Sequence, residues 1–382
     1  MPSPARGASG GPGPDARRAG GTLWAPSLGP TVVGTAPPLQ ETPGAIDRRM
    51  THPAHDADAL KPVLVTGAAG FIGARCLEAC RAAGWPVIAV DTPRYFTERA
   101  EHAPVDPDRI VATDRLDAWL TTAPPLAAIV HLGACTDTRE TDRAYLTATN
   151  LEASQRLWQY ARTHGVPFIY ASSAATYGDG RLGYDDDETL IARLVPLNAY
   201  GDSKQQFDVW ALAEAREGRA PAHWCGLKFF NVYGYGERHK GPMASVVLQA
   251  FDQIRAAGRL RLFRSHRDGI ADGHQARDFV FVDDVVDTLL ALVERPPARG
   301  IFNLGSGRAR TFLDLARATF AALGEPERID FIDTPPDIRA HYQYFTQATM
   351  GRLAAAGYVR RTTSLEEGVR QYVTALEAGP GC

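Results

Sequence analysis

The feature that most constrains this chain is a run of glycines between an apolar strand and a helix. Residues 62–66 read PVLVT, and Gly67, Gly70 and Gly73 follow at the start of a helix expected over residues 71–83. Glycines at these places let the backbone turn sharply and approach a pyrophosphate, whose charge then lies against the helix N-terminus. A glycine pattern alone is compatible with a simple tight turn. Its strand–turn–helix context, however, predicts a dinucleotide-binding site.

Strands and helices alternate along the chain after this motif. Short β-rich runs occur at residues 86–90, 126–131 and 166–171, and a periodic, helix-like segment covers residues 142–164. Strands that alternate with amphipathic helices favour a parallel sheet with helices on both faces. The chain is therefore expected to be an α/β protein with a Rossmann-type, doubly wound parallel sheet.

The pattern changes after residue 231, where the loops become longer. A helix is expected near residues 243–257, with strands near residues 259–263, 300–304 and 328–332. We interpret this region as a smaller, mixed α/β lobe that binds substrate. The expected organisation is an NAD(P)-binding Rossmann domain over residues 60–230 and a mainly substrate-binding lobe over residues 231–378, with some segments of the lobe returning to the Rossmann sheet.

Residues 1–59 differ from the rest of the chain in composition. They are crowded with Gly, Pro, Ala and Ser and have no apolar periodicity, so they cannot bury enough surface to offset the entropy lost on ordering. We expect a disordered N-terminal extension. Its arginines faintly resemble a transit peptide, and a simpler interpretation is that translation starts at Met50.

Composition argues against several classes of protein. The 382 residues include 41 basic and 44 acidic side chains, which is not the charge pattern of a nucleic-acid binder. No apolar run approaches the roughly 20 residues that span a bilayer, and five cysteines in so long a chain do not make a disulfide framework. We expect a cytoplasmic protein with no membrane or nucleic-acid partner. Cys76 and Cys80, one helical turn apart, are interpreted as a buried helix face, and no metal site is expected.

Two side chains near the end of the second expected strand bear on the choice of dinucleotide. Asp91 ends this strand, where a carboxylate accepts hydrogen bonds from the adenosine ribose, and this favours NAD. Arg94 follows three residues later, where a guanidinium meets a 2′-phosphate, and this favours NADP. The two signals conflict, so the residues alone leave the choice open.

A second group of residues indicates proton-transfer chemistry. Tyr200 and Lys204 in YGDSK lie four residues apart, on one face of a helix. A free tyrosine has a pKa of about 10, and a nearby ammonium together with a positive nicotinamide would stabilise its phenolate. Ser173 lies in the segment at the end of the strand expected at residues 166–171 and is placed to bond the same substrate hydroxyl. With the glycine motif upstream, this order predicts a dehydrogenase-type active site.

Further segments narrow the interpretation. They are YASSAATYG at 170–178, FNVYG at 230–234, HKG at 239–241, RDFV at 277–280 and YQYFTQA at 342–348. Together with the glycine motif, they resemble the extended short-chain dehydrogenase/reductase superfamily over residues 62–373. Within it, they resemble the family of ADP-L-glycero-D-manno-heptose 6-epimerases, for which the HKG and FTQ triplets are the most specific.

The resemblance implies an NAD(P)-dependent nucleotide-sugar epimerase. Such an enzyme interconverts ADP-D-glycero-D-manno-heptose and ADP-L-glycero-D-manno-heptose by removing and returning hydride at carbon six, and supplies heptose for the lipopolysaccharide core. It implies Tyr200 and Lys240 as the acid/base residues, because the transient ketone needs such a group in each of two orientations. It also implies NADP as cofactor, with NAD possible, and a homo-oligomer such as a pentamer.

Individual contacts also follow from the resemblance. Arg277 would meet the diphosphate, since a planar guanidinium bonds paired oxygens. The ADP-heptose would be held by Asn231, Lys240, Phe263, Arg264, Ser265, His266, Arg277 and Tyr342. The expected cofactor site, which includes the glycines, Asp91 and Arg94, comprises Gly67, Gly70, Phe71, Ile72, Gly73, Asp91, Thr92, Arg94, Leu132, Gly133, Ala134, Cys135, Thr136, Asn150, Tyr200, Lys204 and Val232.

The chain departs from the family pattern at several positions. Pro242 and Gln249 replace a usual Ser and His, Leu132 replaces a usual Glu, and residues 268–275 have the character of an insertion. These departures put single contacts in doubt rather than the chemistry. Two alternatives stay open, namely another nucleotide-sugar epimerase such as a UDP-sugar 4-epimerase, and a non-catalytic dinucleotide-binding regulator. A sugar 4,6-dehydratase is disfavoured because Ala174 and Ala175 stand where its Asp-Glu pair belongs.

Overall fold

The computed structural model describes residues 60–295, 299–339, 342–358 and 362–379. The expected N-terminal extension, with Met50, lies outside them. Within the described residues, a main sheet contains seven parallel strands in the order β10-β6-β5-β4-β1-β2-β3. Their bounds are β1 (Val63–Thr66), β2 (Val87–Asp91), β3 (Ile110–Ala112), β4 (Ala128–His131), β5 (Phe168–Ser173), β6 (Trp224–Phe229) and β10 (Gly300–Leu304).

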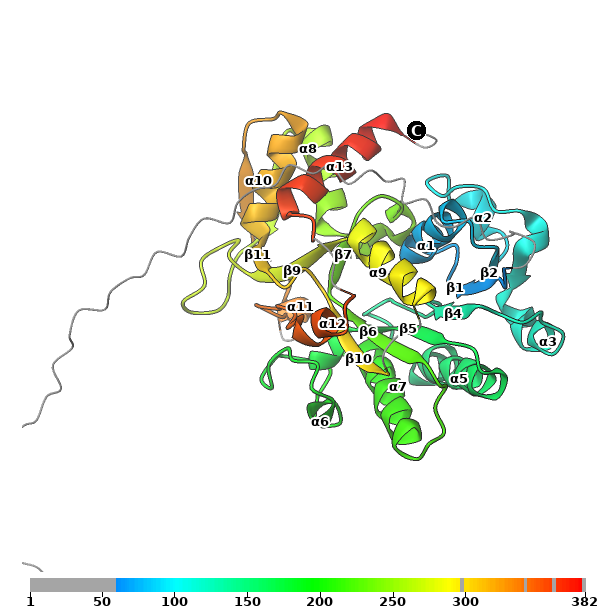
Figure 1. Ribbon diagram of the computed structural model, residues 1–382. Helices are drawn as coiled ribbons and strands as arrows, with labels where there is room; N and C mark the ends of the chain where they lie inside the picture. Colours follow the sequence, from blue (N-terminus) through cyan, green and yellow to red (C-terminus); the bar gives the residue numbers. More distant parts are fainter. Residues whose placement is uncertain (1–59, 296–298, 340–341, 359–361, 380–382) are drawn as a thin grey trace, which may run out of the picture. The chain divides into compact units, whose positions relative to one another are not determined.

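Helices cover both faces of this sheet, because successive residues of a buried strand point to opposite sides. Val63 and Val65 pack with α1 (Phe71–Ala82) and α9 (Val282–Glu294) in one cluster. Leu64 packs with α5 (Ala153–His164) and α7 (Ala199–Arg216) in another. Figure 1 shows the two pairs of helices on either side of the sheet. The expected Rossmann-type, doubly wound parallel sheet is therefore confirmed.

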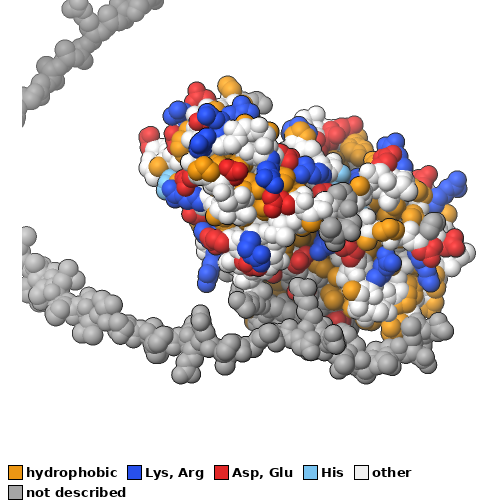
Figure 2. All heavy atoms as spheres, turned by 90° about the horizontal axis from the view of Figure 1, so that it is seen from above, with side chains coloured by type: hydrophobic (Ala, Val, Ile, Leu, Met, Phe, Trp, Pro, Cys, Tyr) orange, Lys and Arg blue, Asp and Glu red, His pale blue; other side chains and the backbone are white. Residues whose placement is uncertain are grey.

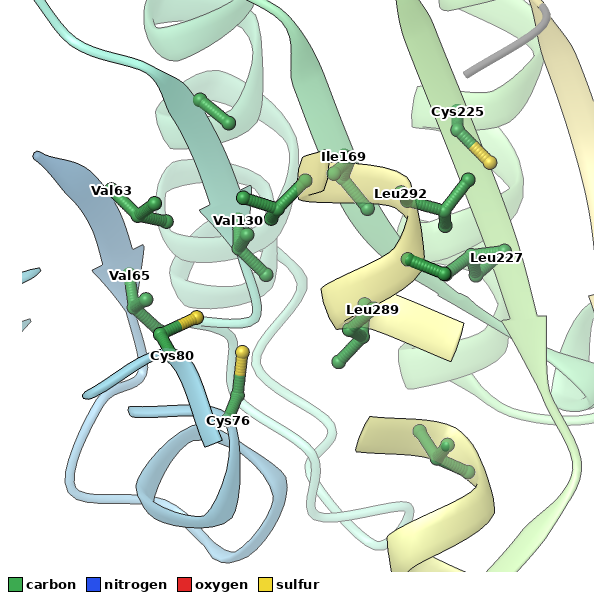
Figure 3. Packing of buried hydrophobic residues seen from close by; sticks show 14 of the residues in the cluster. Val63, Val65, Cys76, Cys80, Val130, Ile169, Cys225, Leu227, Leu289 and Leu292 are labelled. Atoms are coloured by element: carbon green, nitrogen blue, oxygen red, sulfur yellow. The ribbon is translucent and has the colours of Figure 1, made fainter. Parts of the chain in front are cut away.

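The two cysteines of α1 belong to the first of these clusters. Cys76 and Cys80 are 1% and 0% exposed, and Figure 3 shows their side chains near Val65 of the sheet. Each behaves here as a small apolar residue. Their interpretation as a buried helix face is confirmed.

The helix expected over residues 142–164 is present with a change of pitch inside it. Asp142 caps α4 (Arg143–Leu146) by accepting a bond from the Tyr145 amide at 3.0 Å. A π-helical turn at Thr147–Glu152 then leads into α5. π turns are uncommon and gather at functional sites, and this one contains the buried Asn150.

The other helices are short or lie outside the main sheet. The helix expected near residues 243–257 is α8 (Val246–Ala257), which begins later because Ser245 caps it. A 3₁₀ segment at Arg238–Met243 precedes it, with Gly241 in the left-handed region at φ 52°. The remaining helices are α2 (Tyr95–Glu98), α3 (Leu116–Leu120), α6 (Glu188–Ile191), α10 (Phe312–Leu323), α11 (Pro336–Arg339), α12 (Gly351–Ala355) and α13 (Leu365–Ala378).

Two small sheets form a mixed region after residue 231. In the first, β9 (Ala276–Phe281) pairs in parallel with β7 (Asn231–Tyr233) and antiparallel with β11 (Ala309–Thr311). In the second, β8 (Leu260–Phe263) pairs in parallel with β12 (Ile329–Ile332). The strand expected at residues 300–304 is β10, which lies at one edge of the main sheet beside β6. The division into two domains at residue 230 stays a prediction.

Candidate active site

A cleft of about 1050 Å³ opens where the carboxyl ends of several strands of the main sheet meet. β1 lies between β2 and β4, so the strand order reverses there, and ligands of such sheets bind at this switch point. Thr66 of β1, Asp91 of β2, His131 of β4 and Ser173 of β5 all line the cleft. The glycine motif and the Tyr–Lys pair thus face one space.

The glycines form a cradle that a side chain would fill. Gly67 has φ +66°, and a Cβ there would lie 2.7 Å from the Gly133 nitrogen. A Cβ on Gly73 would lie 2.0 Å from the Gly67 carbonyl oxygen. Because α1 begins at Phe71, its first amides face the same loop. The cradle therefore has the shape and polarity that a dinucleotide pyrophosphate requires.

Asp91 is held in place at the end of β2. Its two carboxylate oxygens accept hydrogen bonds from the Ala69 and Thr92 amides at 2.9 and 2.7 Å. This fixes the carboxylate beside the glycine loop, while carboxylate oxygens keep further acceptor capacity for a ribose. Thr92 also lines the cleft.

The basic residue that lines the cleft near Asp91 is Arg99. Its guanidinium donates to the Ala69 carbonyl oxygen and lies 4.1 Å from the ring centre of Tyr95. Burial lowers the pKa of Arg99, and Asp91 opposes that effect. Arg94 also lies near Tyr95, with its guanidinium carbon 5.3 Å from the ring centre, but it is not among the residues that line the cleft. The sequence pattern drew attention to Arg94 and missed Arg99.

One wall of the cleft is the segment after β4, comprising Leu132, Gly133, Ala134, Cys135 and Thr136. Asn150 lies behind it, fully buried, and its side chain bonds both the amide and the carbonyl of Cys135 at 2.8 and 3.0 Å. Asn150 therefore supports this wall from behind, since it is not among the lining residues.

The root of the same wall is a chain of polar side chains. Thr66 Oγ1 lies 2.7 Å from His131 Nδ1, and His131 Nε2 lies 2.9 Å from Ser154 Oγ. Burial, with a smaller effect of Lys204, lowers the pKa of His131 to about 3. His131 is therefore neutral at physiological pH and acts as a bridge rather than as a charge.

Tyr200 and Lys204 lie on α7, four residues apart, and both are buried. Burial raises the pKa of Tyr200, and a side-chain hydrogen bond with Ser173 lowers it in part. Lys204 Nζ donates to the Ala171 carbonyl at 2.9 Å, and burial lowers its pKa to about 8. All three side chains line the cleft, so the structure brings this predicted group together.

Lys240 reaches the same cleft from a different element. It belongs to the 3₁₀ segment Arg238–Met243, and its Nζ lies 5.4 Å from the ring centre of Phe71. On its other side, Nζ lies 3.8 Å from a carboxylate oxygen of Glu237, which is fully buried. Asn231 and Val232, at the start of β7, also line this part of the cleft.

The expected phosphate ligand, Arg277, is buried among aromatic rings outside this lining. Its guanidinium carbon lies 5.6 and 5.4 Å from the ring centres of Phe312 and Tyr342, and burial lowers its pKa. Two of its donors bond the carbonyls of Ala276 and Gln343. Phe263 lies at 6.5 Å from Tyr342, ring centre to ring centre.

Residues 268–275 fold back onto the expected substrate loop. Asp272 accepts a bond from the Ser265 amide at 2.8 Å and pairs with Arg264 at 3.3 Å. The His266 amide donates to the Tyr344 hydroxyl at 3.0 Å. Phe263, Arg264, Ser265, His266, Arg277 and Tyr342 are thus held near one another, but not among the residues that line the main cleft.

Comparisons with known proteins agree with this architecture. A model of the NAD dependent epimerase/dehydratase family matches residues 63–305. The ADP-L-glycero-D-manno-heptose-6-epimerases of Nitratidesulfovibrio vulgaris and Fusobacterium nucleatum are 45% and 40% identical to the chain, each over 81% of this chain and 96% of the relative. The solved structure of the Helicobacter pylori ADP-L-glycero-D-manno-heptose-6-epimerase is 23% identical, with a TM-score of 0.67, over 85% of this chain and 98% of that one.

The chain belongs to the ADP-L-glycero-D-manno-heptose-6-epimerase family. Membership makes it a nucleotide-sugar epimerase of the NAD-dependent type, as the family resemblance implied. The alternative of a non-catalytic regulator is accordingly set aside.

The departures from the family pattern have local structural roles. The Gln249 side chain donates to the carbonyls of Pro242 and Ala244, at 3.3 and 3.0 Å, and so ties α8 to the segment that contains Lys240. Leu132 packs at the edge of the sheet cluster.

Two further observations concern possible binding partners, namely the charges on the surface and the apolar character of the helices. Figure 2 shows acidic and basic side chains interspersed on the face in view, with no large field of one sign. Among the described residues, no helix combines the length and apolar character needed to cross a bilayer.

Proposed function

We propose that this epimerase interconverts ADP-D-glycero-D-manno-heptose and ADP-L-glycero-D-manno-heptose at carbon six. One observation carries the proposal: two proton-transfer side chains, Tyr200 of α7 and Lys240 of the 3₁₀ segment after β7, line the same cleft as the glycine cradle. An enzyme that inverts a secondary alcohol through a ketone must handle the oxygen in two poses. Two such groups on different elements meet that need.

The roles follow from the contacts. A dinucleotide held at the glycine cradle would supply the hydride acceptor and donor that inversion at carbon six requires. Tyr200 takes or gives the hydroxyl proton in one pose, with Ser173 bonded to it, and Lys240 serves the other pose. Lys204 keeps its ammonium near neutral pH and supports the Tyr200 phenolate and the ribose. Phe71, Ile72 and Val232 form the apolar part of the pocket that excludes water.

The ADP moiety would engage the ring-lined group around Arg277. Its guanidinium must exchange bonds to the Ala276 and Gln343 carbonyls for bonds to phosphate oxygens, which are the stronger, charge-assisted kind. Tyr342 lies against this guanidinium, and Phe263 packs against Tyr342.

Conversion of the substrate tests the proposal directly. The purified protein is incubated with ADP-D-glycero-D-manno-heptose, and the sugar product is followed by NMR. Appearance of the L-glycero epimer is expected. No conversion by protein shown to contain bound dinucleotide would favour the UDP-sugar 4-epimerase alternative, which the same assay with UDP-glucose then examines.

The role of Lys240 has its own test. Lys240→Met keeps the apolar stem over Phe71 and removes the proton-transfer group. Epimerisation is expected to fall by about 10²–10⁴-fold, while bound dinucleotide and melting temperature stay near those of the parent. Normal turnover would leave Lys240 as a substrate contact and Tyr200 as the sole acid/base residue.

We further propose that the cofactor is NADP, with NAD as the alternative, and that Arg99 is the residue that meets the 2′-phosphate. The support is its place beside Asp91 in the cleft and its stacking on Tyr95. Arg99→Ala should weaken NADP binding by about 1.5–3 kcal/mol, the value of one hydrogen bond to a charged group, and NAD binding much less.

Arg94→Ala, which removes the residue first expected in this role, is the matched variant. If Arg94→Ala weakens NADP binding more than NAD binding, and Arg99→Ala does not, the 2′-phosphate binds Arg94 instead. Equal weakening of both dinucleotides by Arg99→Ala would contradict the assignment.

The remaining parts of the proposal concern setting and assembly. We propose that the protein works in the cytoplasm as a homo-oligomer such as a pentamer, and that its product is used for the lipopolysaccharide core. Analytical ultracentrifugation measures the assembly state, and a stable monomer at micromolar concentration would remove that part.

A further inference from the structure

Glu237 is a buried carboxylate directly behind Lys240, and the sequence interpretation did not single it out. It lies three residues before Lys240, in the turn that leads into the 3₁₀ segment. Its exposure is 0%, whereas the Lys240 side chain is 28% exposed. Carboxylates this deeply buried are almost always paired with a cation or fully hydrogen-bonded.

The hydrogen bonds around Glu237 fit the ionised form. The Ser245 amide donates to one carboxylate oxygen at 2.7 Å, and the Ser245 and Tyr372 hydroxyls donate to the other. The oxygen that accepts from the amide also lies 3.8 Å from Lys240 Nζ. Four positive or donor groups therefore surround one carboxylate, which matches the acceptor capacity of an ionised group.

Three separate elements converge on this carboxylate. Lys240 comes from the 3₁₀ segment, Ser245 caps α8, and Tyr372 comes from α13 near the end of the chain. Tyr372 itself is 1% exposed. The position of the carboxylate, and with it that of Lys240, is thus fixed by packing and not by the short local segment alone.

We propose that Glu237 is a positioning residue that holds Lys240 at the cleft wall as an ammonium ion. It rests on the proposed function, because it deepens the role of Lys240 in that reaction. The buried carboxylate, 3.8 Å from Nζ, supplies a fixed counter-charge that holds the Lys240 side chain in place. In this arrangement Lys240 gives a proton to the ketone oxygen in one pose, and Tyr200 takes the hydroxyl proton in the other.

Other titratable groups surround Glu237 and Lys240, and the variants that test this pair should leave these groups unchanged. Burial raises the pKa of Glu237 above its usual value, and Lys240, Ser245 and Tyr372 offset only part of this increase. Burial, together with Arg99, His102 and Lys240, lowers the pKa of His239 to about 3. On the far side, the charged groups near Tyr372 are Glu101 and Arg238.

Glu237→Gln tests the proposal, because the amide keeps the shape and loses the charge. The pH dependence of epimerisation is measured together with kcat, KM and the melting temperature. We expect kcat to fall by less than the ~10²–10⁴-fold of a lost acid/base group, with KM little changed. Because glutamine does not titrate, the part of the acid limb that reports protonation of Glu237, whose pKa is raised by burial, should be lost from the pH profile.

Tyr372→Phe is a second variant with its own expected direction. It removes one hydrogen bond that lowers the pKa of Glu237, so Glu237 should lose its charge at a higher pH as the solution is acidified. The acid limb should then move to higher pH. Tyr358→Phe is the control, since it removes a hydroxyl bonded at the same 3.2 Å to the Arg295 carbonyl, far from Lys240.

The outcomes separate the inference from the function on which it rests. A parent protein that does not convert ADP-heptose removes the proposed function. An active parent whose Glu237→Gln and Tyr372→Phe variants only lose melting temperature, with unmoved pH limbs, assigns Glu237 to structure alone and overturns the inference. If Glu237→Gln does not fold, the acid limb of Tyr372→Phe still gives the answer.

Discussion

Breaking the buried ion pair beneath the Tyr–Lys helix should destabilise the protein strongly. Lys228 of β6 and Asp208 of α7 are both 0% exposed, and their charged atoms lie 2.6 Å apart. Asp208 also accepts from the hydroxyls of Tyr170 and Ser172, at 3.0 and 2.7 Å. Asp208→Asn keeps the shape of the side chain but leaves the Lys228 ammonium without a counter-charge inside the core.

The magnitude follows from that geometry. Removing one partner of a buried pair costs about 3–5 kcal/mol, because the other charge is left uncompensated. For a folded region of this size, that corresponds to a melting temperature lower by roughly 4–8 °C. Glu367→Gln is the matched control. Glu367 pairs with Arg370 at 2.6 Å, but both are about half exposed, and such pairs contribute only about 0–1 kcal/mol.

Urea unfolding, followed by tryptophan fluorescence, measures both variants. Adding Lys228→Met to Asp208→Asn should recover part of the loss, since the unpaired charge is then gone. A loss below ~1 kcal/mol for Asp208→Asn, or strict additivity in the double variant, would refute the argument that the charge pair dominates this network.

Three further predictions concern the site. Gly73→Ala places a Cβ 2.0 Å from the Gly67 carbonyl oxygen, so it should cost about 1–3 kcal/mol of stability and weaken dinucleotide binding measured by calorimetry. Gly351→Ala is the control and should change neither quantity, because nothing lies within 4 Å of its Cβ position. Unchanged dinucleotide affinity in Gly73→Ala would contradict the assignment of the cradle. Since burial lowers the pKa of Lys204 to about 8, the ammonium is present below that pH, and activity should fall as pH rises through it. Because the unfolded chain keeps the Lys204 proton up to about pH 10.4, the contribution of Lys204 to stability should instead rise between these values; a stability curve that falls there in the parent but not in Lys204→Met would oppose the assignment. Epimerisation in deuterated water should leave carbon six unlabelled by NMR, because hydride moves between substrate and cofactor only, and label at carbon six would point to proton abstraction from carbon.

Local sequence determined much of this protein. The PVLVT run, the glycines and the four-residue spacing of Tyr200 and Lys204 predicted the dinucleotide fold and the proton-transfer pair, because turn geometry and helical period are encoded by neighbouring residues. Lys240 and Arg277 came from the family resemblance and not from any local rule. The strands β3, β6, β7, β9 and β11 were not expected. Three of them, β3, β7 and β11, have only three residues each, and short apolar runs do not separate strand from buried helix by periodicity.

Tertiary structure decided the rest, because it depends on residues that meet only when distant segments pack. Arg99 is one arginine among many until α2 and the turn after it bring it to the cleft and leave Arg94 on the outside. In the sequence, Glu237 is an ordinary charged residue in a polar turn. It becomes a buried carboxylate behind Lys240 only because Ser245 and Tyr372, from two helices, pack against it and donate hydrogen bonds. β10 likewise joins the main sheet, because its apolar residues are buried when it pairs with β6. Spacing along the chain sets which side chains share a face, whereas burial and pairing are set by the packing of elements far apart in the sequence, and no local pattern records them.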